Sequence, residues 1–223
     1  YDILKKLPSN SDVLFALQDE NKLNISAENS KFNLLCLPVD NFPNFAEDFK
    51  ANEINIDREK LLNLLNKTRI SMSNDETRHY LNGIFIHITE SNKKSYLTGV
   101  ATDSHRLSSS SIPLEKIQEF KPFILPKKAV FQLCNLLQES KEQVLLYSGD
   151  SKIQFKIGNS KIISKIIDGK FPDYKKVVPQ NNSKTLVVNA KDFIHSIERV
   201  ITVSIDRKEG VKIALKKDHI QLF

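Results

Sequence analysis

Three consecutive residues, Asp103, Ser104 and His105, bring together an acid, a hydroxyl and an imidazole, from which hydrolases build a nucleophile and its base. Residues one apart on a strand face opposite sides, so Ser104 cannot readily meet either neighbour. The sequence has no Gly-x-Ser-x-Gly, phosphate-binding glycine loop or His-Glu-x-x-His. We therefore expect no catalytic residue and no enzyme. His105 is expected in a binding groove, with a merely packed imidazole as the alternative.

Cationic and amide side chains follow three stretches of helical periodicity, each opposite an apolar stripe. They are Lys60, Asn63 and Lys67, then Lys128, Gln132 and Asn135, then Lys191, His195 and Arg199. Such faces attract phosphates through Coulomb forces and counterion release without reading bases, and a simply solvated face is the alternative. Aromatic residues do not interleave with these cations, which disfavours a platform for stacking single-stranded bases.

The elements that must position these residues can be read from caps and alternation. A short strand at 54–56 ends at Asp57, another at 186–188 ends at Asn189, and each polar residue can cap the helix that follows. Pro126 is placed to start the second helix. Further strands are expected at 83–89, 96–102, 106–112, 144–148, 152–157 and 161–167, with turns at Gly149-Asp150 and Gly158-Asn159. The predicted class is α+β with antiparallel sheets.

Composition narrows the class of protein. At 40% hydrophobic and 27% charged residues the chain can bury a normal core, and its net charge of +6 mildly favours a polyanionic partner. No apolar run approaches the roughly 18 residues of a membrane span. Cys36 and Cys134 lack metal-ligand spacing, so we expect two thiols in a reducing cytoplasm, with a disulfide as the alternative. The chain starts at Tyr1 without a signal pattern, and we expect it to be truncated at both ends.

The chain repeats itself at an offset of about 130 residues. Lys22-Leu23-Asn24-Ile25 matches Lys152-Ile153-Gln154-Phe155, Ser30-Lys31-Phe32 matches Ser160-Lys161-Ile162, and Phe42-Pro43-Asn44-Phe45 matches Phe171-Pro172-Asp173-Tyr174. The period is too long for a solenoid and predicts duplicated domains, with chance similarity of β-rich segments as the alternative. We expect residues 1–50 to finish one module, 51–180 to make a complete second module, and 181–223 to begin a third.

Three segments stand together in one order and spacing. They are Arg78-His79-Tyr80-Leu81-Asn82-Gly83, then Val100-Ala101-Thr102-Asp103-Ser104-His105-Arg106-Leu107, then Asp168-Gly169-Lys170-Phe171-Pro172-Asp173-Tyr174-Lys175-Lys176-Val177-Val178-Pro179. Together they resemble signatures of the bacterial DNA sliding clamps, the beta subunits of DNA polymerase III, across essentially the whole chain. The resemblance implies the DNA-clamp fold, with tandem similar modules whose antiparallel sheets lie outside and whose two helices line a central hole. It implies a homodimeric ring that encircles double-stranded DNA without sequence specificity and confers processivity without catalysis.

The same resemblance assigns residues to three surfaces. A partner-peptide pocket would be lined by Leu81, Thr102, Ser104, His105, Arg106, Leu107, Pro172, Lys176 and Val177. DNA would face Lys60, Asn63, Lys67, Arg78, His79, Tyr80, Lys128, Gln132, Lys191, His195 and Arg199. The dimer seam would include Phe32, Leu34, Thr202 and Val203. In the family the residue at Ser104 is usually glycine, and we expect the serine to narrow the backbone path.

The resemblance implies that the pocket receives linear motifs of the polymerase III catalytic subunit, the clamp loader and repair polymerases. It implies no cofactor, no metal and no membrane partner. The alternative function is a free-standing nucleic-acid- or peptide-binding domain that forms no ring. That alternative accounts for the basic faces but not for the repeat.

Overall fold

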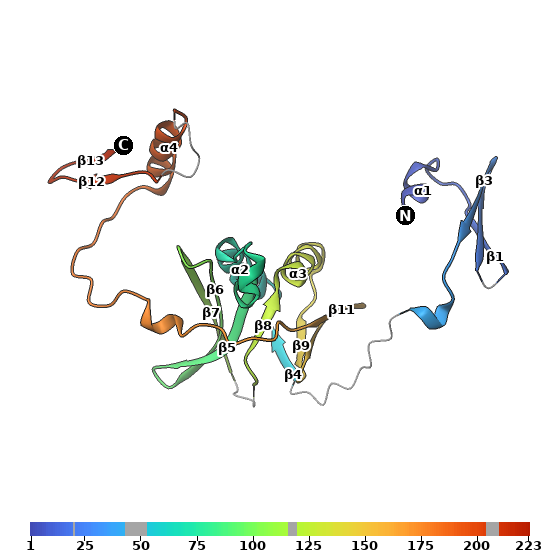
Figure 1. Cartoon of the computed structure of the whole chain (residues 1–223), viewed down its shortest axis with the longest axis horizontal. Helices are drawn as coiled ribbons and strands as arrows, with labels where there is room; N and C mark the ends of the chain where they lie inside the picture. Colours follow the sequence, from blue (N-terminus) through green and yellow to red (C-terminus); the bar gives the residue numbers. More distant parts are fainter. Residues whose placement is uncertain (20, 43–52, 116–119, 204–209) are drawn as a thin grey trace. The chain divides into compact units, whose positions relative to one another are not determined.

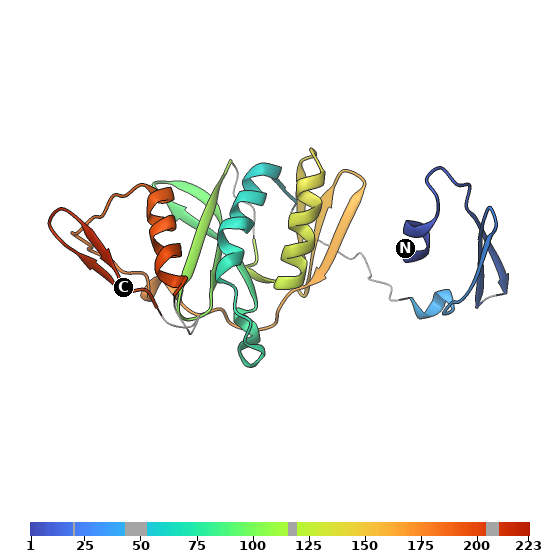
Figure 2. The ribbon, with the colours of Figure 1, turned by 90° about the horizontal axis from the view of Figure 1, so that it is seen from above.

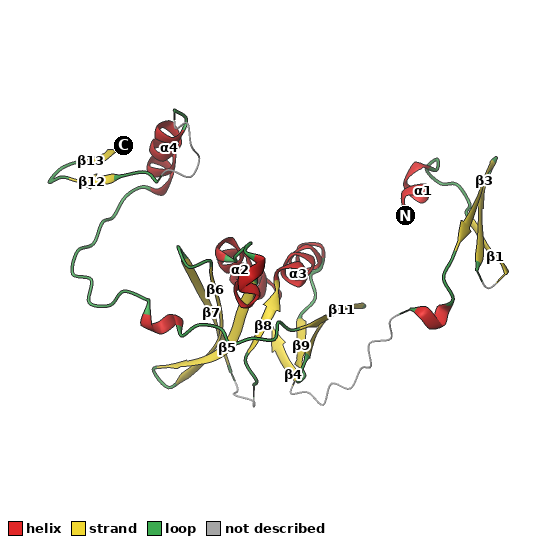
Figure 3. Ribbon diagram, in the orientation of Figure 1, coloured by secondary structure: helices red, strands yellow, loops and turns green. Residues whose placement is uncertain are grey.

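In a computed structural model, residues 1–19, 21–42, 53–115, 120–203 and 210–223 are described, and the chain divides into two compact units, Tyr1–Phe171 and Pro172–Phe223. The first unit contains helices α1 (Asp2–Lys6), α2 (Arg58–Thr68) and α3 (Lys127–Glu139), and 3-10 helices η1 (Val39–Asn41), η2 (Arg69–Ser71) and η3 (Glu76–Leu81). Its strands are β1 (Leu14–Asp19), β2 (Lys22–Ala27), β3 (Ser30–Leu35), β4 (Glu53–Ile56), β5 (Gly83–Ser91), β6 (Lys94–Thr102), β7 (Leu107–Leu114), β8 (Phe123–Pro126), β9 (Val144–Ser148), β10 (Lys152–Ile157) and β11 (Ser160–Lys165). The second unit contains η4 (Tyr174–Lys176), α4 (Ala190–Ile201), β12 (Ile213–Leu215) and β13 (Ile220–Leu222) (Figure 3).

The part of the first unit from β4 to β11 is built on two four-stranded antiparallel sheets. Their strand orders are β7-β6-β5-β8 and β11-β10-β9-β4, and a bridge between Ile124 and Ile167 ties the chain beyond β11 to β8. Helices α2 and α3 contact each other and lie side by side on the same side of both sheets (Figures 1 and 2). Helix α2 packs on β6 and β7, and α3 packs on β5, β8 and β11. The arrangement therefore leaves the outer sides of both helices facing away from the sheets.

The core between helices and sheets is formed by the apolar stripes of both helices. Leu61, Leu64 and Leu65 of α2 are buried, as are Leu133 and Leu137 of α3. Their spacing of three or four residues puts them on one helix face. Burying a leucine side chain contributes about 1.5–3 kcal/mol, so these residues fix the helices on the sheets.

The predicted starts of the three helices are confirmed. Asp57 Oδ1 accepts a hydrogen bond from the Lys60 amide at 2.9 Å, and Asn189 Oδ1 accepts one from the Lys191 amide at 3.0 Å. Pro126 is the N-cap residue of α3. The Asp57 and Asn189 contacts satisfy backbone amides that have no partner within the first turn of their helices.

The expected strand at 186–188 is wrong, because these residues have no strand conformation. A strand is held by pairing its backbone with a neighbour, as β4 pairs with β9. Within the described part of the second unit the sheet consists of β12 and β13 only, and neither pairs with 186–188. The sequence pattern alone therefore did not suffice to make a strand.

The repeat recurs in the strand pairing. The pair Lys22↔Leu35 between β2 and β3 recurs as Lys152↔Lys165 between β10 and β11, at a constant offset of 130 residues. In each case a further antiparallel strand, β1 or β9, flanks the hairpin. The turns at Gly149-Asp150 and Gly158-Asn159 lie between β9, β10 and β11 as predicted, and Gly158 has a φ of 55°, which favours glycine. The division into three modules stays a prediction.

Candidate nucleic-acid interface and binding loop

The exposed sides of α2 and α3 carry the predicted cationic and amide residues. Lys60, Asn63 and Lys67 on α2 are exposed between the buried leucines, and Lys128 and Gln132 on α3 are exposed as well. The two helices that carry these residues contact each other and lie side by side on the sheets (Figure 2). Long cationic side chains on such a surface can approach phosphates while their helices stay packed.

In the second unit, helix α4 carries the third group of predicted cationic and polar residues. Lys191, His195 and Arg199 are all exposed, and Arg199 Nη2 donates to Ser196 Oγ at 2.9 Å. Asp192, which lies in the first turn, complements the positive helix N-terminus. Helix α4 therefore carries exposed cations on one face and an acidic residue in its first turn.

The three predicted residues on η3 are engaged with the protein itself. Arg78 is half-buried and donates from Nε to Asp75 Oδ2 at 2.8 Å and from Nη1 to Ser104 Oγ at 2.7 Å. His79 Nε2 lies 3.1 Å from the carbonyl oxygen of Asp168. A Cβ added to Gly169 would lie 3.1 Å from the Tyr80 Cβ, so Tyr80 packs closely on that glycine. Assignment of these three residues to DNA stays a prediction.

The segment with the candidate acid, hydroxyl and imidazole is a loop between β6 and β7. The strands predicted at 96–102 and 106–112 agree with β6, which ends at Thr102, and β7, which starts at Leu107, so the strand geometry used to separate Asp103, Ser104 and His105 does not apply to this loop. Asp103 causes the break: its Oδ1 accepts hydrogen bonds from the amides of His105 and Arg106, each at 3.0 Å. Side chains of aspartate that bond to amides two residues on favour turns over strands.

The Asp103 carboxylate is committed to holding this loop. Burial would raise its pKa, but the amides of Arg106 and His105 and the Arg106 guanidinium, at 3.0 Å from Oδ2, hold the pKa below its ordinary value. Thr102 Oγ1 also donates to the Arg106 carbonyl at 2.7 Å and accepts from the Ser104 amide at 3.1 Å. Ser104 Oγ accepts from Arg78. These contacts give the loop a defined shape and use its polar groups for structure.

The predicted pocket residues are divided between the two units. Leu81 is buried below the surface, Thr102 and Leu107 are half-buried, and Ser104, His105 and Arg106 are exposed in the first unit. In the second unit Pro172, Lys176 and Val177 are exposed, and Lys176 Nζ lies 3.2 Å from Asp173 Oδ2. Thr102, Ser104, His105, Arg106 and Leu107 thus share one loop and its two ends, whereas Leu81 is the last residue of η3.

The predicted seam residues are also found in both units. Phe32 and Leu34 lie on β3, at the edge of the sheet β1-β2-β3, where Leu34 is exposed. Thr202 ends α4 and donates from Oγ1 to the Glu198 carbonyl, and Val203 follows it, exposed. Their role in dimerisation stays a prediction.

An aromatic stack on the far side of β5 was missed from the sequence. The rings of Phe85 and Phe171 stack at 4.9 Å between centroids, and those of Phe85 and His87 at 4.7 Å. Phe171 comes from the chain beyond β11, and a hollow of about 660 Å³ beside it includes Lys121 and Asp150, which form an ion pair at 2.9 Å. The isoleucines of β5 lie in the core, and side chains alternate along a strand, so Phe85 and His87 must lie on the opposite side of β5. That Phe171 stacks on Phe85 there is known only from the tertiary structure.

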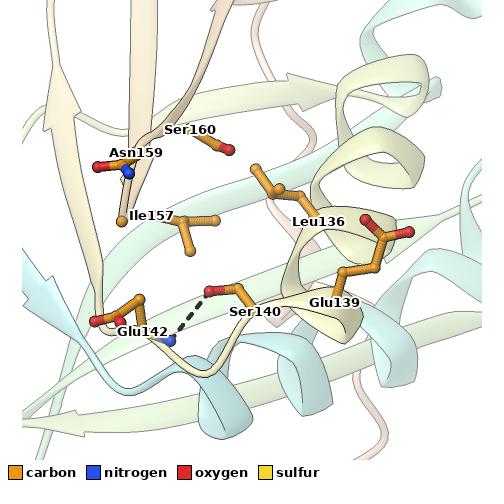
Figure 4. A pocket seen from close by; sticks show the side chains of 8 residues that line it. Leu136, Glu139, Ser140, Glu142, Ile157, Asn159 and Ser160 are labelled. Atoms are coloured by element: carbon orange, nitrogen blue, oxygen red, sulfur yellow. Dashed lines mark hydrogen bonds between the residues drawn. The ribbon is translucent and has the colours of Figure 1, made fainter. Parts of the chain in front are cut away.

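A second hollow, of about 420 Å³, lies where α3 ends near the turn between β10 and β11 (Figure 4). Leu136 and Ile157 form its floor, Glu139 and Glu142 stand at its rim, and the Glu142 amide donates to Ser140 Oγ at 3.1 Å. Its two acids would repel phosphates. We assign no chemistry to it.

Other classes of site find no support among the described residues. No group of three or more histidine, cysteine or acidic side chains there could hold a metal ion. No helix in the described ranges is long and apolar enough to cross a membrane. Cys36 and Cys134 are both free, and burial raises the pKa of the Cys134 thiol, with Arg69 opposing the rise.

Comparison with known proteins gives a consistent set of similarities. Residues 55–173, just over half of the chain, match the family model for the central domain of the DNA polymerase III beta subunit. The chain is 36% identical to the beta sliding clamp of Caulobacter vibrioides over 224 residues and 37% identical to that of Rickettsia bellii over 229 residues. It is covered in full by the first alignment and to 99% by the second, but spans only 60% and 58% of those relatives' lengths.

Solved structures agree. The crystal structure of the Caulobacter crescentus beta sliding clamp superposes with a TM-score of 0.94 at 36% identity, covering 100% of this chain and 60% of that one. A DnaN sliding clamp from Bartonella birtlesii bound to griselimycin superposes with a TM-score of 0.93 at 35% identity, with the same coverage. The predicted clamp fold is confirmed by these similarities.

Proposed function

Because the chain belongs to the DNA polymerase III beta subunit family, we propose that it is part of a sliding clamp that encircles double-stranded DNA. The clamp tethers the replicative polymerase and so confers processivity, and it performs no catalysis of its own. The observation that carries the proposal is the pair of helices α2 and α3, side by side on the sheets with exposed lysines and amides on their outer sides. Such a surface neutralises phosphates without reading bases.

Weak phosphate contacts suit a protein that must move along DNA. A closed ring is held by topology, so no single contact has to be strong. Strong bonds to base edges would favour particular sequences and oppose sliding. Lys60 and Lys67 on α2, Lys128 on α3, and Lys191 and Arg199 on α4 are the cations that would face the duplex. Asn63, Gln132 and His195 would add polar contacts to the backbone.

The second proposed surface is a peptide pocket at the loop of residues 102–107. Leu107, which is half-buried, supplies apolar surface, and Thr102, Ser104, His105 and Arg106 supply polar groups; the family resemblance also assigns the buried Leu81 to this pocket. The family resemblance also assigns Pro172, Lys176 and Val177 to this pocket. A linear motif with a few apolar anchors fits a groove of this composition. We propose the polymerase III catalytic subunit, the clamp loader and repair polymerases as its partners, in the cytoplasm.

The intact protein would be a homodimer of three similar modules in each subunit. Residues 1–50 would finish the first module, 51–180 make the second, and 181–223 begin the third. Phe32 and Leu34 on an exposed sheet edge would meet the segment around Thr202 and Val203 of the other subunit. An edge strand offers unpaired backbone groups, which suits it to such pairing.

The proposal is tested by DNA topology. The intact-length protein is loaded onto nicked circular plasmid, separated from free protein, and the plasmid is then cut once. We expect retention on the circle and release after cutting, because the ring slides off the ends. Equal retention on circular and linear DNA would contradict the clamp. A monomeric mass in solution would contradict the dimer.

The helix faces are tested by paired charge reversals in the same protein. Lys60→Glu with Lys67→Glu alters α2, and Lys156→Glu with Lys165→Glu changes the charge equally on exposed residues of β10 and β11. On a short linear duplex, the first pair should lower the slope of log affinity against log salt by about one per lost phosphate contact. The second pair should leave the slope near that of the wild type. Equal effects of both pairs would refute the assignment of the face.

The pocket is tested with griselimycin, which the Bartonella birtlesii clamp binds. We expect the intact-length protein to bind labelled griselimycin, and Val177→Glu to weaken binding because it puts a charge on an apolar wall. Lys156→Glu on β10 is the control. If Val177→Glu binds as the wild type does, Val177 is not part of the pocket for this ligand.

A further inference from the structure

We propose that Arg78 is a positioning residue that holds the loop of residues 102–107 in its binding shape through Ser104, and that it is not a phosphate contact. This inference rests on the proposed pocket and reassigns one residue that the family resemblance puts on the DNA side. It concerns a bond that a glycine at position 104 could not make.

The Arg78 guanidinium is already committed on two of its donor atoms. Nε donates to Asp75 Oδ2 at 2.8 Å, and Nη1 donates to Ser104 Oγ at 2.7 Å. Asp75 is in turn held by Thr77, whose hydroxyl and amide donate to Oδ1 at 2.6 and 2.9 Å. The Thr77 hydroxyl, the Arg78 guanidinium and the Thr77 amide lower the pKa of Asp75 to about 2, so it is ionised at neutral pH. The arginine is thus aimed at Ser104 by an anchored carboxylate.

Ser104 is the residue of the loop that most needs an external contact. Its φ is 78°, a left-handed conformation that side chains other than glycine rarely adopt. The hydrogen bonds of Asp103 and Thr102 close the loop on itself, whereas the Arg78 bond joins its tip to η3. A tip under backbone strain and tied to another element at one hydroxyl would change shape when that bond is lost.

Two neighbouring contacts show that η3 also holds the chain beyond β11. His79 Nε2 lies 3.1 Å from the Asp168 carbonyl, and Tyr80 packs closely on Gly169. Two residues later Phe171 enters the aromatic stack with Phe85. Consecutive residues of η3 therefore contact both the loop and the segment that leads to Pro172. This is the arrangement expected of a support for a binding site, since rigid neighbours must hold the groups that meet a ligand.

A phosphate role would use the N–H groups that remain on Nη1 and Nη2. An anion would have to approach a half-buried guanidinium that Asp75 and Ser104 already hold in one direction, whereas Lys60 and Lys67 are exposed on α2. Lysine could replace an arginine that acts only as a charge. It could not reproduce two directed bonds from Nε and Nη1.

The test is a double-mutant cycle of Arg78→Ala and Ser104→Ala in the intact-length protein. One readout is hydrogen exchange of the Ser104, His105 and Arg106 amides, whose acceptors lie within the loop. The second is the affinity for griselimycin. The third is the salt slope of binding to a short linear duplex. Arg199→Ala, which removes another arginine bonded to a serine, is the matched control.

We expect each single variant to speed exchange of the loop amides and to weaken griselimycin binding roughly three- to tenfold. The double variant should be no weaker than either single variant, because both remove one bond. Arg78→Lys should behave as Arg78→Ala does, and all should keep the wild-type salt slope. Arg199→Ala should instead lower the slope by about one and leave loop exchange unchanged.

Two results would overturn the inference. One is unchanged loop exchange in Arg78→Ala together with a salt slope lowered by about one, which identifies a phosphate contact. The other is additive losses in the cycle, which means that Arg78 and Ser104 act separately. If the wild type neither binds griselimycin nor stays on circular DNA, the proposed function fails. Loop exchange, which needs neither ligand nor DNA, still decides whether Arg78 holds the loop.

Discussion

Replacing Gly99 by alanine should destabilise the protein, although alanine is ordinarily the better residue of the two within a strand. A Cβ at this position of β6 would lie 2.5 Å from Leu64 Cδ2, 3.2 Å from Leu64 Cγ and 3.3 Å from Ile84 Cγ2. Leu64 is 1% exposed and lies on α2, so it has little room to move. The glycine lets the helix that carries Lys60 and Lys67 lie close to the sheet.

The magnitude follows from two opposing effects. Overpacking a core costs about 1–3 kcal/mol, and exchanging a strand glycine for alanine returns about 0.5–1 kcal/mol. Gly99→Ala should therefore lower the free energy of unfolding by about 1–2 kcal/mol. Leu64→Ala alone should lower it by about 2–5 kcal/mol. Once Leu64 is truncated the main clash is gone, so adding Gly99→Ala should then raise stability by about 0.5–1 kcal/mol.

Urea unfolding of the four proteins, with hydrogen exchange of the Val100 and Ala101 amides, measures the cycle. Gly210→Ala is the control, because nothing lies within 4 Å of the position where its Cβ would be built. The reversal of sign corresponds to a coupling of about 1.5–3 kcal/mol, in the range seen for residues in contact. If Gly99→Ala destabilises the Leu64→Ala protein as much as the wild type, Leu64 does not limit the approach of α2, and the packing argument is wrong.

Three further outcomes are expected. Asp57→Ala should lower the free energy of unfolding by about 0.5–2 kcal/mol, because the Lys60 amide loses its acceptor, while Asp57→Asn should restore most of it; an unchanged urea midpoint in Asp57→Ala would argue against the cap. The folded-state pKa of Asp75 is about 2, below the ordinary 3.8, so its contribution to stability is present above about pH 4 and is lost as pH falls towards 2. The Asp75→Asn protein should therefore show a smaller change in its free energy of unfolding between pH 4 and pH 2. An Asp75 carboxyl that titrates near pH 4 by NMR would contradict this. Asp103→Asn should speed exchange of the His105 amide by roughly fivefold, since an amide oxygen is a weaker acceptor than a carboxylate, and unaltered exchange would show that other contacts hold the loop.

Much of the fold could be predicted because its signals are local. Asp57 and Asn189 cap helices through amides two or three residues away, and β9, β10 and β11 follow alternation and turns that a short window contains. The family resemblance extends over the whole chain and pointed to the fold before any contact was known. The exposed lysines of α2 follow from the helical period, since the leucines occupy the other face.

The features that could not be predicted from the sequence depend on contacts between residues distant in the chain. Residues 186–188 have a strand-like pattern but no partner in the described part of their unit, and pairing decides whether a strand forms. The family resemblance put Arg78 on the DNA side, and only the structure shows its bond to Ser104, 26 residues away. Composition and period determine which side chains are available, whereas the atom that each one meets is set by how the elements pack.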